Sequence, residues 1–460
     1  MKISSHILIE TSSSVELLER TGHKPGALDW VLVCGVCTVL LFAVLAFGAV
    51  DEWSIFTLEA GAAVLFLLWT AKQVVSGRIK LSNNPLYPSA ALFFGLMIAQ
   101  MVLRRSAYGY VTKYEMLQYV SYGLLLLVAA ECIKSQDTRR LFAQIMSAFG
   151  ACYAVFSLVQ AFSSTGKIYW IHSPQFTSAK VFGSYVNHNH YAGVMEMLTP
   201  IPFVLSMGHL LKGGKRVLTG FVAALMVATI FISGSRGGMI AFIFEAVLFA
   251  ALAFGKKRSS RVALGSMAVC VFILALLFFL DQGQALSHLG DLAPGIRLDI
   301  TKDSLRMFSE RPLLGWGLGT FPTVYPRYRS FYTNLFINEA HNDYAQLLVE
   351  TGLLGFGLMI WFLVQLYRYG LPTSRRWEFQ WDWALSFAAL LGCTGILVHS
   401  FVDFNLQIPA NAALFYVLSG LAATTPLKSL SPGRTRSSRE GRSRRRPDRT
   451  DNGESLDWSL

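Results

Sequence analysis

Three residues in the second half of the chain have side chains suited to binding an anion and moving a proton: Arg236, Arg297 and His341. A guanidinium offers a planar set of N–H donors that matches phosphate oxygens. An imidazole can accept a proton near neutral pH and so act as a general base. We therefore predict that the three residues, although far apart in the sequence, surround one cavity and act together.

Arg236 lies in the segment SGSRGG (233–238), which is typical of a glycine-bracketed turn leading into a helix. The first backbone N–H groups of a helix have no partner within it, and they lie at the positive end of the helix dipole. Such a turn is an anion site even before the guanidinium is added, and we include Ser235 among the substrate-binding residues. The alternative is that Arg236 caps a tight hairpin and reaches lipid headgroups.

Arg297, in GIRLDI, is predicted to open an amphipathic helix that lies at a membrane interface. The alternative for this arginine is a place on a solvated helix face. One face of the predicted helix carries Ile296, Ile300 and Met307, and another carries Arg297, Thr301 and Ser304.

His341 and Asn342 lie in EAHNDY (339–344), directly before an apolar segment. An imidazole there could serve as general base, with Asn342 as a substrate contact. The alternative is a capping or interfacial histidine. If His341 is not the general base that activates a substrate hydroxyl, Asp343 and Asp403 are the other candidates.

The segment KVFGSYVNHNHYAG (180–193) contains four consecutive polar residues just before a predicted helix. Asn187, His188, Asn189 and His190 are predicted to bind substrate, with helix capping as the alternative. The spacing H-x-H is a weak metal signal when no carboxylate or cysteine is near it in the sequence. We therefore expect no metal and no cofactor.

Two further groups of residues are open to two interpretations each. Glu59, Glu196 and Glu245 lie deep in apolar segments, where they mark either a proton path or hydrogen bonds between helices. Six aromatic residues could stack on sugars or form an interfacial belt: they are Trp316, Phe321, Tyr325, Tyr328, Phe331 and Tyr332.

Membrane helices must position these residues, because 53% of the 460 residues are hydrophobic, only 15% are charged, and the apolar ones form long runs. A helix needs about 20 such residues to cross about 30 Å of hydrocarbon. We predict an all-α polytopic membrane protein with about twelve transmembrane helices. The approximate spans are 28–49, 54–74, 87–103, 115–132, 141–162, 190–211, 217–233, 238–255, 262–280, 344–369, 384–403 and 409–425.

The positions of lysine and arginine predict the orientation, since these residues concentrate in cytoplasmic loops. With the N-terminus inside, 28 of the 40 lie on the inner side. Residues 1–27 then form a cytoplasmic segment, 28–425 the transmembrane domain and 426–460 a basic, disordered cytoplasmic tail. The polar interval 281–342 becomes a large loop on the outer face, and the candidate residues lie in it or beside it.

The cysteines and the net charge predict little about function. All six cysteines lie in or at the edge of apolar segments, so no disulfide framework is expected. The formal net charge of +12 owes much to the basic tail, for which contact with anionic membrane lipid is expected rather than nucleic-acid binding.

Three segments resemble the shared core of the bacterial O-antigen ligase and O-antigen polymerase superfamily: SGSRGGMIAF, GIRLDITKDSLRMFSERPLLGWGLGTFPTVYP and NEAHNDYAQLLVETGLLGFGLMIWF. The resemblance covers about residues 180–405 through the order and spacing of these parts. It implies a glycosyltransferase of the GT-C type in the inner membrane. Such an enzyme takes a glycan from undecaprenyl diphosphate on the periplasmic face, with inversion and without a metal.

The resemblance also implies roles for individual residues. Arg236 and Arg297 match the family's two arginines that are proposed to hold the diphosphate. His341 matches the histidine proposed to activate the acceptor hydroxyl, and Asn189 matches the asparagine of the loop before the sixth span. The chemistry agrees, because a diphosphate leaving group needs its developing charge neutralised and a sugar hydroxyl needs a base.

The acceptor stays open between several possibilities. A ligase joins the glycan to lipid A core, whereas a polymerase joins it to another lipid-linked repeat, and we favour the ligase. Protein-glycosylating relatives are expected to carry a large periplasmic C-terminal domain, which this sequence does not show. A lipid-glycan transporter would show internal repeats and discontinuous helices with polar groups near the midplane, and we find no repeat between the halves. A non-enzymatic scaffold would not need arginines that converge on a histidine.

Overall fold

The computed structural model describes residues 25–79, 81–164, 166–173, 180–254, 294–334, 336–372 and 375–424. Within these ranges the chain is helical, apart from two isolated β-bridges. Most of the predicted N-terminal segment 1–27, the predicted span 262–280 and the predicted tail 426–460 lie outside the described residues.

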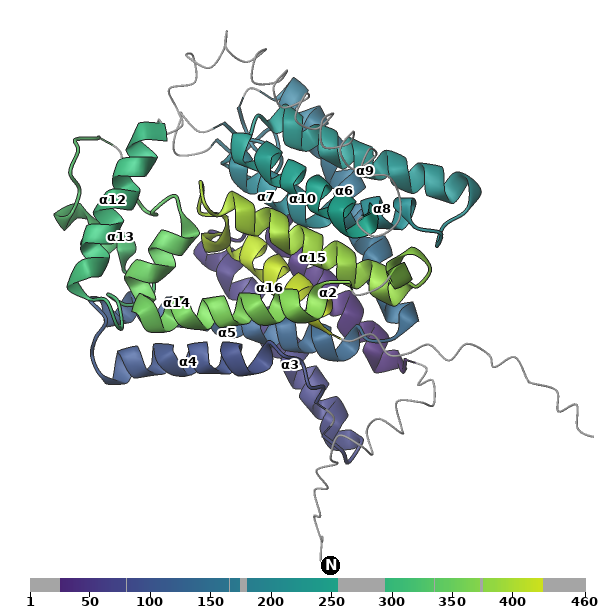
Figure 1. The fold of residues 1–460 in the computed structure, drawn as a ribbon, viewed down its shortest axis with the longest axis horizontal. Helices are drawn as coiled ribbons and strands as arrows, with labels where there is room; N and C mark the ends of the chain where they lie inside the picture. Colours follow the sequence, from purple (N-terminus) through teal and green to yellow (C-terminus); the bar gives the residue numbers. More distant parts are fainter. Residues whose placement is uncertain are drawn as a thin grey trace, which may run out of the picture.

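The helices of the described residues are shown in Figure 1. They are α2 (Ala27–Leu45), α3 (Glu52–Val75), α4 (Tyr87–Val102), α5 (Gly109–Cys132), α6 (Gln136–Ser163), α7 (His188–Leu198), α8 (Pro200–Met207), α9 (Gly213–Ser233), α10 (Arg236–Phe254), α12 (Pro294–Glu310), α13 (Phe321–Val324), α14 (Asp343–Gly370), α15 (Trp381–His399) and α16 (Pro409–Ala423), with 3₁₀ turns η2 (Tyr325–Arg327), η3 (Arg375–Glu378) and η4 (Asn405–Gln407).

α15 and α16 form the centre of the bundle (Figure 1). α15 packs against α7, α8, α10 and α16, and α16 packs against α5. Nearly every residue of both helices is buried, as expected for helices that are apolar on all sides. The loop that joins them therefore lies in the middle of one end of the bundle.

Seven helices of the described chain are long and apolar enough to cross a membrane: α2, α3, α6, α9, α10, α14 and α15. α4 and α16 are apolar but shorter. These helices agree with the predicted all-α polytopic class. Each predicted span within the described residues overlaps a helix, while the total of about twelve crossings stays a prediction.

Two predicted spans are interrupted. The span at 190–211 is formed by α7 and then α8, which begins at Pro200, a residue with no N–H for a helical hydrogen bond. α14 is interrupted at Gly352, whose φ of 65° lies in the left-handed region. The two interrupted spans begin beside His190 and His341, which are candidate residues of the site.

The segment GWGLGTF (315–321) docks on the interruption of α14. The Trp316 N–H donates to the Val349 carbonyl at 3.0 Å. A Cβ on Gly315 would lie 2.4 Å from the backbone carbonyl carbon of Glu350, so only glycine permits this approach. The interruption in α14 therefore fixes the position of α12, which directly precedes this segment.

The described part of the interval 281–342 has a small core of its own. Ile300 and Met307 of α12 pack with Trp316, Phe321 and Tyr325, and all five side chains are almost completely buried. This corrects the prediction for the three aromatic residues, which stabilise the segment instead of forming a sugar-stacking wall or an interfacial belt. The apolar face predicted for this helix does form the contact.

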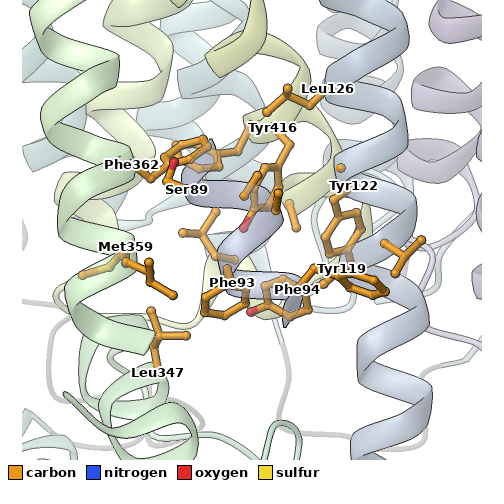
Figure 2. A pocket seen from close by; sticks show the side chains of 18 of the residues that line it. Ser89, Phe93, Phe94, Tyr119, Tyr122, Leu126, Leu347, Met359, Phe362 and Tyr416 are labelled. Carbon is orange, nitrogen blue, oxygen red and sulfur yellow. The ribbon is translucent and has the colours of Figure 1, made fainter. Parts of the chain in front are cut away.

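A cavity of about 440 Å³ lies between α4, α5, α14 and α16 (Figure 2). Its wall is mostly apolar and includes Phe93, Tyr119, Phe362 and Tyr416. One end of the cavity adjoins the loop between α15 and α16, where the candidate residues meet.

Candidate active site

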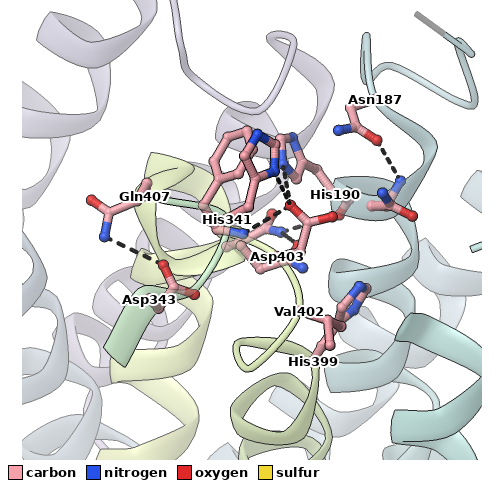
Figure 3. A network of polar contacts seen from close by, with 12 residues as sticks. Asn187, His190, His341, Asp343, His399, Val402, Asp403 and Gln407 are labelled. Carbon is pink, nitrogen blue, oxygen red and sulfur yellow. Dashed lines mark hydrogen bonds and ion pairs between the residues drawn. The ribbon is translucent and has the colours of Figure 1, made fainter. Parts of the chain in front are cut away.

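The loop between α15 and α16, residues 400–408, lies at the centre of the candidate site (Figure 3). It joins two almost wholly buried helices, so its position is set by the core of the bundle. The Ser400 carbonyl accepts a hydrogen bond from the Asp343 N–H at 3.0 Å, which ties the loop to the start of α14. Residues from α7, α10, α12 and the segment before α14 contact this loop.

The carboxylate of Asp403 is the centre of the cluster. Its Oδ1 lies 3.8 Å from His190 Nε2 and 3.9 Å from His341 Nδ1, and its Oδ2 lies 3.7 Å from a terminal nitrogen of Arg297. Burial raises the pKa of Asp403, but the close approach and charge of His190, with the charges of Arg297 and His399, hold this pKa well below its usual value. Asp403 therefore supplies a fixed negative charge at neutral pH.

Arg297 reaches the loop from the first turn of α12. A terminal nitrogen donates to the Val402 carbonyl at 2.5 Å, in addition to the ion pair with Asp403. Ser304, predicted on the polar face of this helix, is instead buried and donates to the Ile300 carbonyl at 2.7 Å. The reason is that α12 packs against both its own small core and α14, which leaves a narrower polar face.

His341 stands directly before α14 with a φ of 51°, a left-handed conformation that residues with side chains seldom adopt. Asn342 caps the helix, since its Oδ1 accepts from the Ala345 N–H at 3.0 Å. Its Nδ2 donates to the Phe401 carbonyl at 3.1 Å. These contacts hold the turn in which the imidazole faces Asp403 (Figure 3).

Arg236 is the first residue of α10, so the prediction that it stands at a helix start is confirmed. The turn before it uses Gly234, whose φ of 80° is left-handed. Ser235 is buried and its Oγ accepts from the Gly238 N–H at 3.1 Å, which satisfies one N–H of the first turn. Ser235 thus acts as a helix cap, and the Arg236 side chain is exposed.

The start of α10 touches the same loop that Arg297 binds. A Cβ on Gly237 would lie 2.4 Å from His399 Nε2 and 3.1 Å from a methyl group of Val402. Val402 also supplies the carbonyl that Arg297 binds. The structure therefore brings the helix start that bears Arg236 together with Arg297 and His341, around one short loop.

A buried histidine–glutamate pair lies at the end of α15, directly before loop 400–408. His399 Nδ1 and Glu196 Oε1 are 2.9 Å apart, and both side chains are almost fully buried. The pair joins α7 to the end of α15, which agrees with helix-to-helix hydrogen bonding, one of the two alternatives for Glu196. A Cβ on Gly238 would lie 2.9 Å from the same carboxylate oxygen, so α10 packs closely against the pair.

The four polar residues before and within α7 have different environments. Asn187 caps α7 by accepting from the Asn189 N–H at 2.8 Å. The His188 N–H donates to the Lys180 carbonyl at 3.0 Å. His190 faces Asp403, and its ring packs edge-on against Phe404, as does the His341 ring, both at 4.7 Å between centroids. His190 is thus the member of this group that contacts the cluster.

The geometry joins arginines, histidines and a buried carboxylate at one end of a bundle of membrane-type helices. Residues 221–360 match the family model of the O-antigen ligases. The matched residues run from α9 into α14, and they include Arg236, Arg297 and His341. The predicted resemblance is confirmed, and the match implies a ligase- or polymerase-type activity on lipid-linked glycans. A comparison with curated proteins finds no match.

Two residues outside the matched range 221–360 contribute to the site in ways that the sequence does not make plain. Asp403 is central because its partners come from separate elements, and only the fold brings these elements together. Lys180 lies beside the turn before α10, since a Cβ on Gly234 would be 2.6 Å from its ammonium nitrogen. The only sequence signal for either is its place in a polar segment between apolar ones.

Proposed function

We propose that the protein is an O-antigen ligase that moves a glycan from undecaprenyl diphosphate to a hydroxyl of lipid A core, at the periplasmic face of the bacterial inner membrane. The observation that carries the proposal is the meeting of Arg297, His341 and the start of α10 at one loop. Guanidinium groups for a diphosphate and an imidazole for a hydroxyl are the groups that this transfer needs.

The arginines act on the diphosphate of the donor. As the bond between the anomeric carbon and the diphosphate oxygen breaks, its electron pair goes to that oxygen and negative charge develops there. Arg236 and the first N–H groups of α10 stabilise this charge from one side, and Arg297 from another. Asp403 and the Val402 carbonyl hold Arg297 in place before the donor binds, so less freedom is lost on binding.

His341 acts on the acceptor hydroxyl. Asp403 lies on the Nδ1 side of the ring, where its charge favours a proton on Nδ1 and leaves Nε2 as the basic nitrogen. Nε2 takes the hydroxyl proton while the oxygen bonds to the anomeric carbon, opposite the departing diphosphate. The product is therefore inverted at that carbon, and Asp403 stabilises the imidazolium that forms.

The test is glycan transfer by the purified full chain in lipid nanodiscs, with an undecaprenyl diphosphate-linked glycan as donor. One reaction contains lipid A core, and a second contains the donor alone. The proposal predicts glycan-bearing lipid A core in the first reaction and no chain growth in the second. Longer lipid-linked glycans in the second reaction would make the protein a polymerase, and no transfer in either would refute the proposal.

A further inference from the structure

The cavity between α4, α5, α14 and α16 plays no part in the chemistry described above (Figure 2). Its volume of about 440 Å³ lies in the range of sites that bind small molecules. Tyrosine hydroxyls apart, the polar side chains in its wall are those of Ser89, Asp343 and Gln407. Such a wall suits a hydrocarbon and would not compensate a charged or hydroxylated group for lost water.

One end of the cavity is the underside of the candidate site. Asp343 and Gln407 line this end, and Asp343 follows His341 by two residues. The Asp343 carboxylate accepts from the Leu406 N–H at 3.1 Å and from the Gln407 side chain at 3.3 Å. Asp343 and Gln407, which line the cavity, thus belong to the start of α14 and to loop 400–408, the loop that carries Asp403 (Figure 3).

The other end lies near the beginning of α4. Leu81 and Tyr87 line it, and the Tyr87 hydroxyl donates to the Glu131 carboxylate at 2.8 Å. Glu131 also accepts from the Ser82 N–H at 2.9 Å and pairs with Lys134 at 2.6 Å. The apolar space therefore runs along the helices from the site to a polar cluster.

We infer that this cavity binds the hydrocarbon chain of the lipid diphosphate donor. The inference rests on the proposed function, because it takes the diphosphate to lie at Arg236 and Arg297. A donor has one chain attached directly to its diphosphate, and a single apolar space whose wall includes Asp343 and Gln407, beside the candidate site, fits that shape. Lipid A carries several acyl chains side by side, whereas this cavity is one space.

Gly123 of α5 offers a direct way to fill the cavity. It is half-buried in the cavity wall, and a Cβ built on it meets nothing within 4 Å. A leucine at this position would add an apolar side chain at the cavity wall, where its Cβ has room. Gly95 of α4 is a matched control, because a Cβ on it also meets nothing within 4 Å, but it is exposed and lies outside the cavity wall.

The first measurement compares donors that differ only in chain length. Undecaprenyl diphosphate-glycan and a short farnesyl diphosphate-glycan are transferred by the full chain in nanodiscs. Gly123→Leu should raise KM for the long-chain donor at least about tenfold and leave KM for the short-chain donor and for the acceptor unchanged. Gly95→Leu should match the wild type with both donors.

The second measurement detects binding without transfer. Undecaprenyl diphosphate with a diazirine within its chain should label α5 and α14 of the wild type, and Gly123→Leu should remove this labelling. If labelling behaves in this way but no glycan is transferred, the proposed function fails and the lipid site stands. Labelling elsewhere, equal labelling of Gly123→Leu, or a rise in KM for the acceptor instead of the donor would overturn the inference.

Discussion

Replacing Asp403 by asparagine removes one negative charge and almost no volume. That charge lies 3.9 Å from the His341 ring and 3.7 Å from Arg297. At an effective dielectric constant of about 20, two unit charges 3.9 Å apart interact by about 332/(20 × 3.9), or about 4 kcal/mol. Since about 1.4 kcal/mol is tenfold in rate, the loss of half to all of this stabilisation predicts a fall of about 30- to 10³-fold.

The pH dependence separates this electrostatic role from a loss of structure. The carboxylate favours the protonated imidazole, so the rising limb of the rate–pH profile should move to lower pH in Asp403→Asn. Because the folded-state pKa of Asp403 lies below its unfolded value, its stabilisation of the fold is present above about pH 4 and is lost as the pH falls through the folded-state pKa. At neutral pH the assay therefore compares an ionised carboxylate at position 403 in the wild type with an uncharged amide in Asp403→Asn.

The assay is single-turnover glycan transfer in nanodiscs across about pH 5 to 9, which covers the range in which an imidazole titrates. Asp299→Asn is the control. Asp299 lies in α12, the helix that carries Arg297, but its carboxylate pairs with Lys302 at 3.3 Å on an exposed surface, where an ion pair contributes little. Asp299→Asn should transfer at the wild-type rate. A rate for Asp403→Asn within about threefold of the wild type, with an unshifted profile, would refute the reasoning.

Three other predictions concern the arginines, the base and the docking segment. Arg236→Lys and Arg297→Lys should each lower the transfer rate at least about tenfold, because an ammonium cannot reproduce the two-point contact of a guanidinium with phosphate. Arg306→Lys, on the exposed face of α12, should leave the rate unchanged. Wild-type rates for both Arg236→Lys and Arg297→Lys would exclude a diphosphate clamp. Transfer should survive EDTA, and His341→Ala should lower it about 10²-fold or more; recovery by a divalent ion after chelation would point to a metal mechanism. Gly315→Ala should lower the midpoint of thermal unfolding, since it combines a left-handed backbone with a contact of 2.4 Å, and an unchanged midpoint would contradict tight docking.

The helices could be predicted from the sequence because long apolar runs report directly on burial in lipid or protein. The interruption of α14 could not, since the left-handed Gly352 is stabilised by a segment about thirty residues earlier that docks on it. The docking of this segment also explains why its aromatic residues are buried. Trp316 and Phe321 look suited to sugars or to an interface, but they are needed to build the core beneath α12.

For the site, the sequence identified the residues whose chemistry is unusual in an apolar chain, such as Arg236 and His341. It did not identify what holds them. Asp403 gains its role from partners contributed by three other elements, and no spacing along the chain encodes that meeting. The sequence predicts Ser235 and Asn342 as substrate contacts, but their side chains cap helices. Polar residues at helix starts can cap the helix or bind a ligand, so the sequence alone does not distinguish the two roles.

Arg236, Arg297 and His341 are proposed to act on one donor. A cryo-electron microscopy structure of the full chain in nanodiscs, with undecaprenyl diphosphate bound, would show whether all three reach it. We predict diphosphate density within hydrogen-bond distance of both guanidinium groups, with the His341 ring on the opposite side of the position of the anomeric carbon, where the acceptor hydroxyl would lie. Diphosphate density away from loop 400–408, or either guanidinium directed into the lipid, would contradict the account.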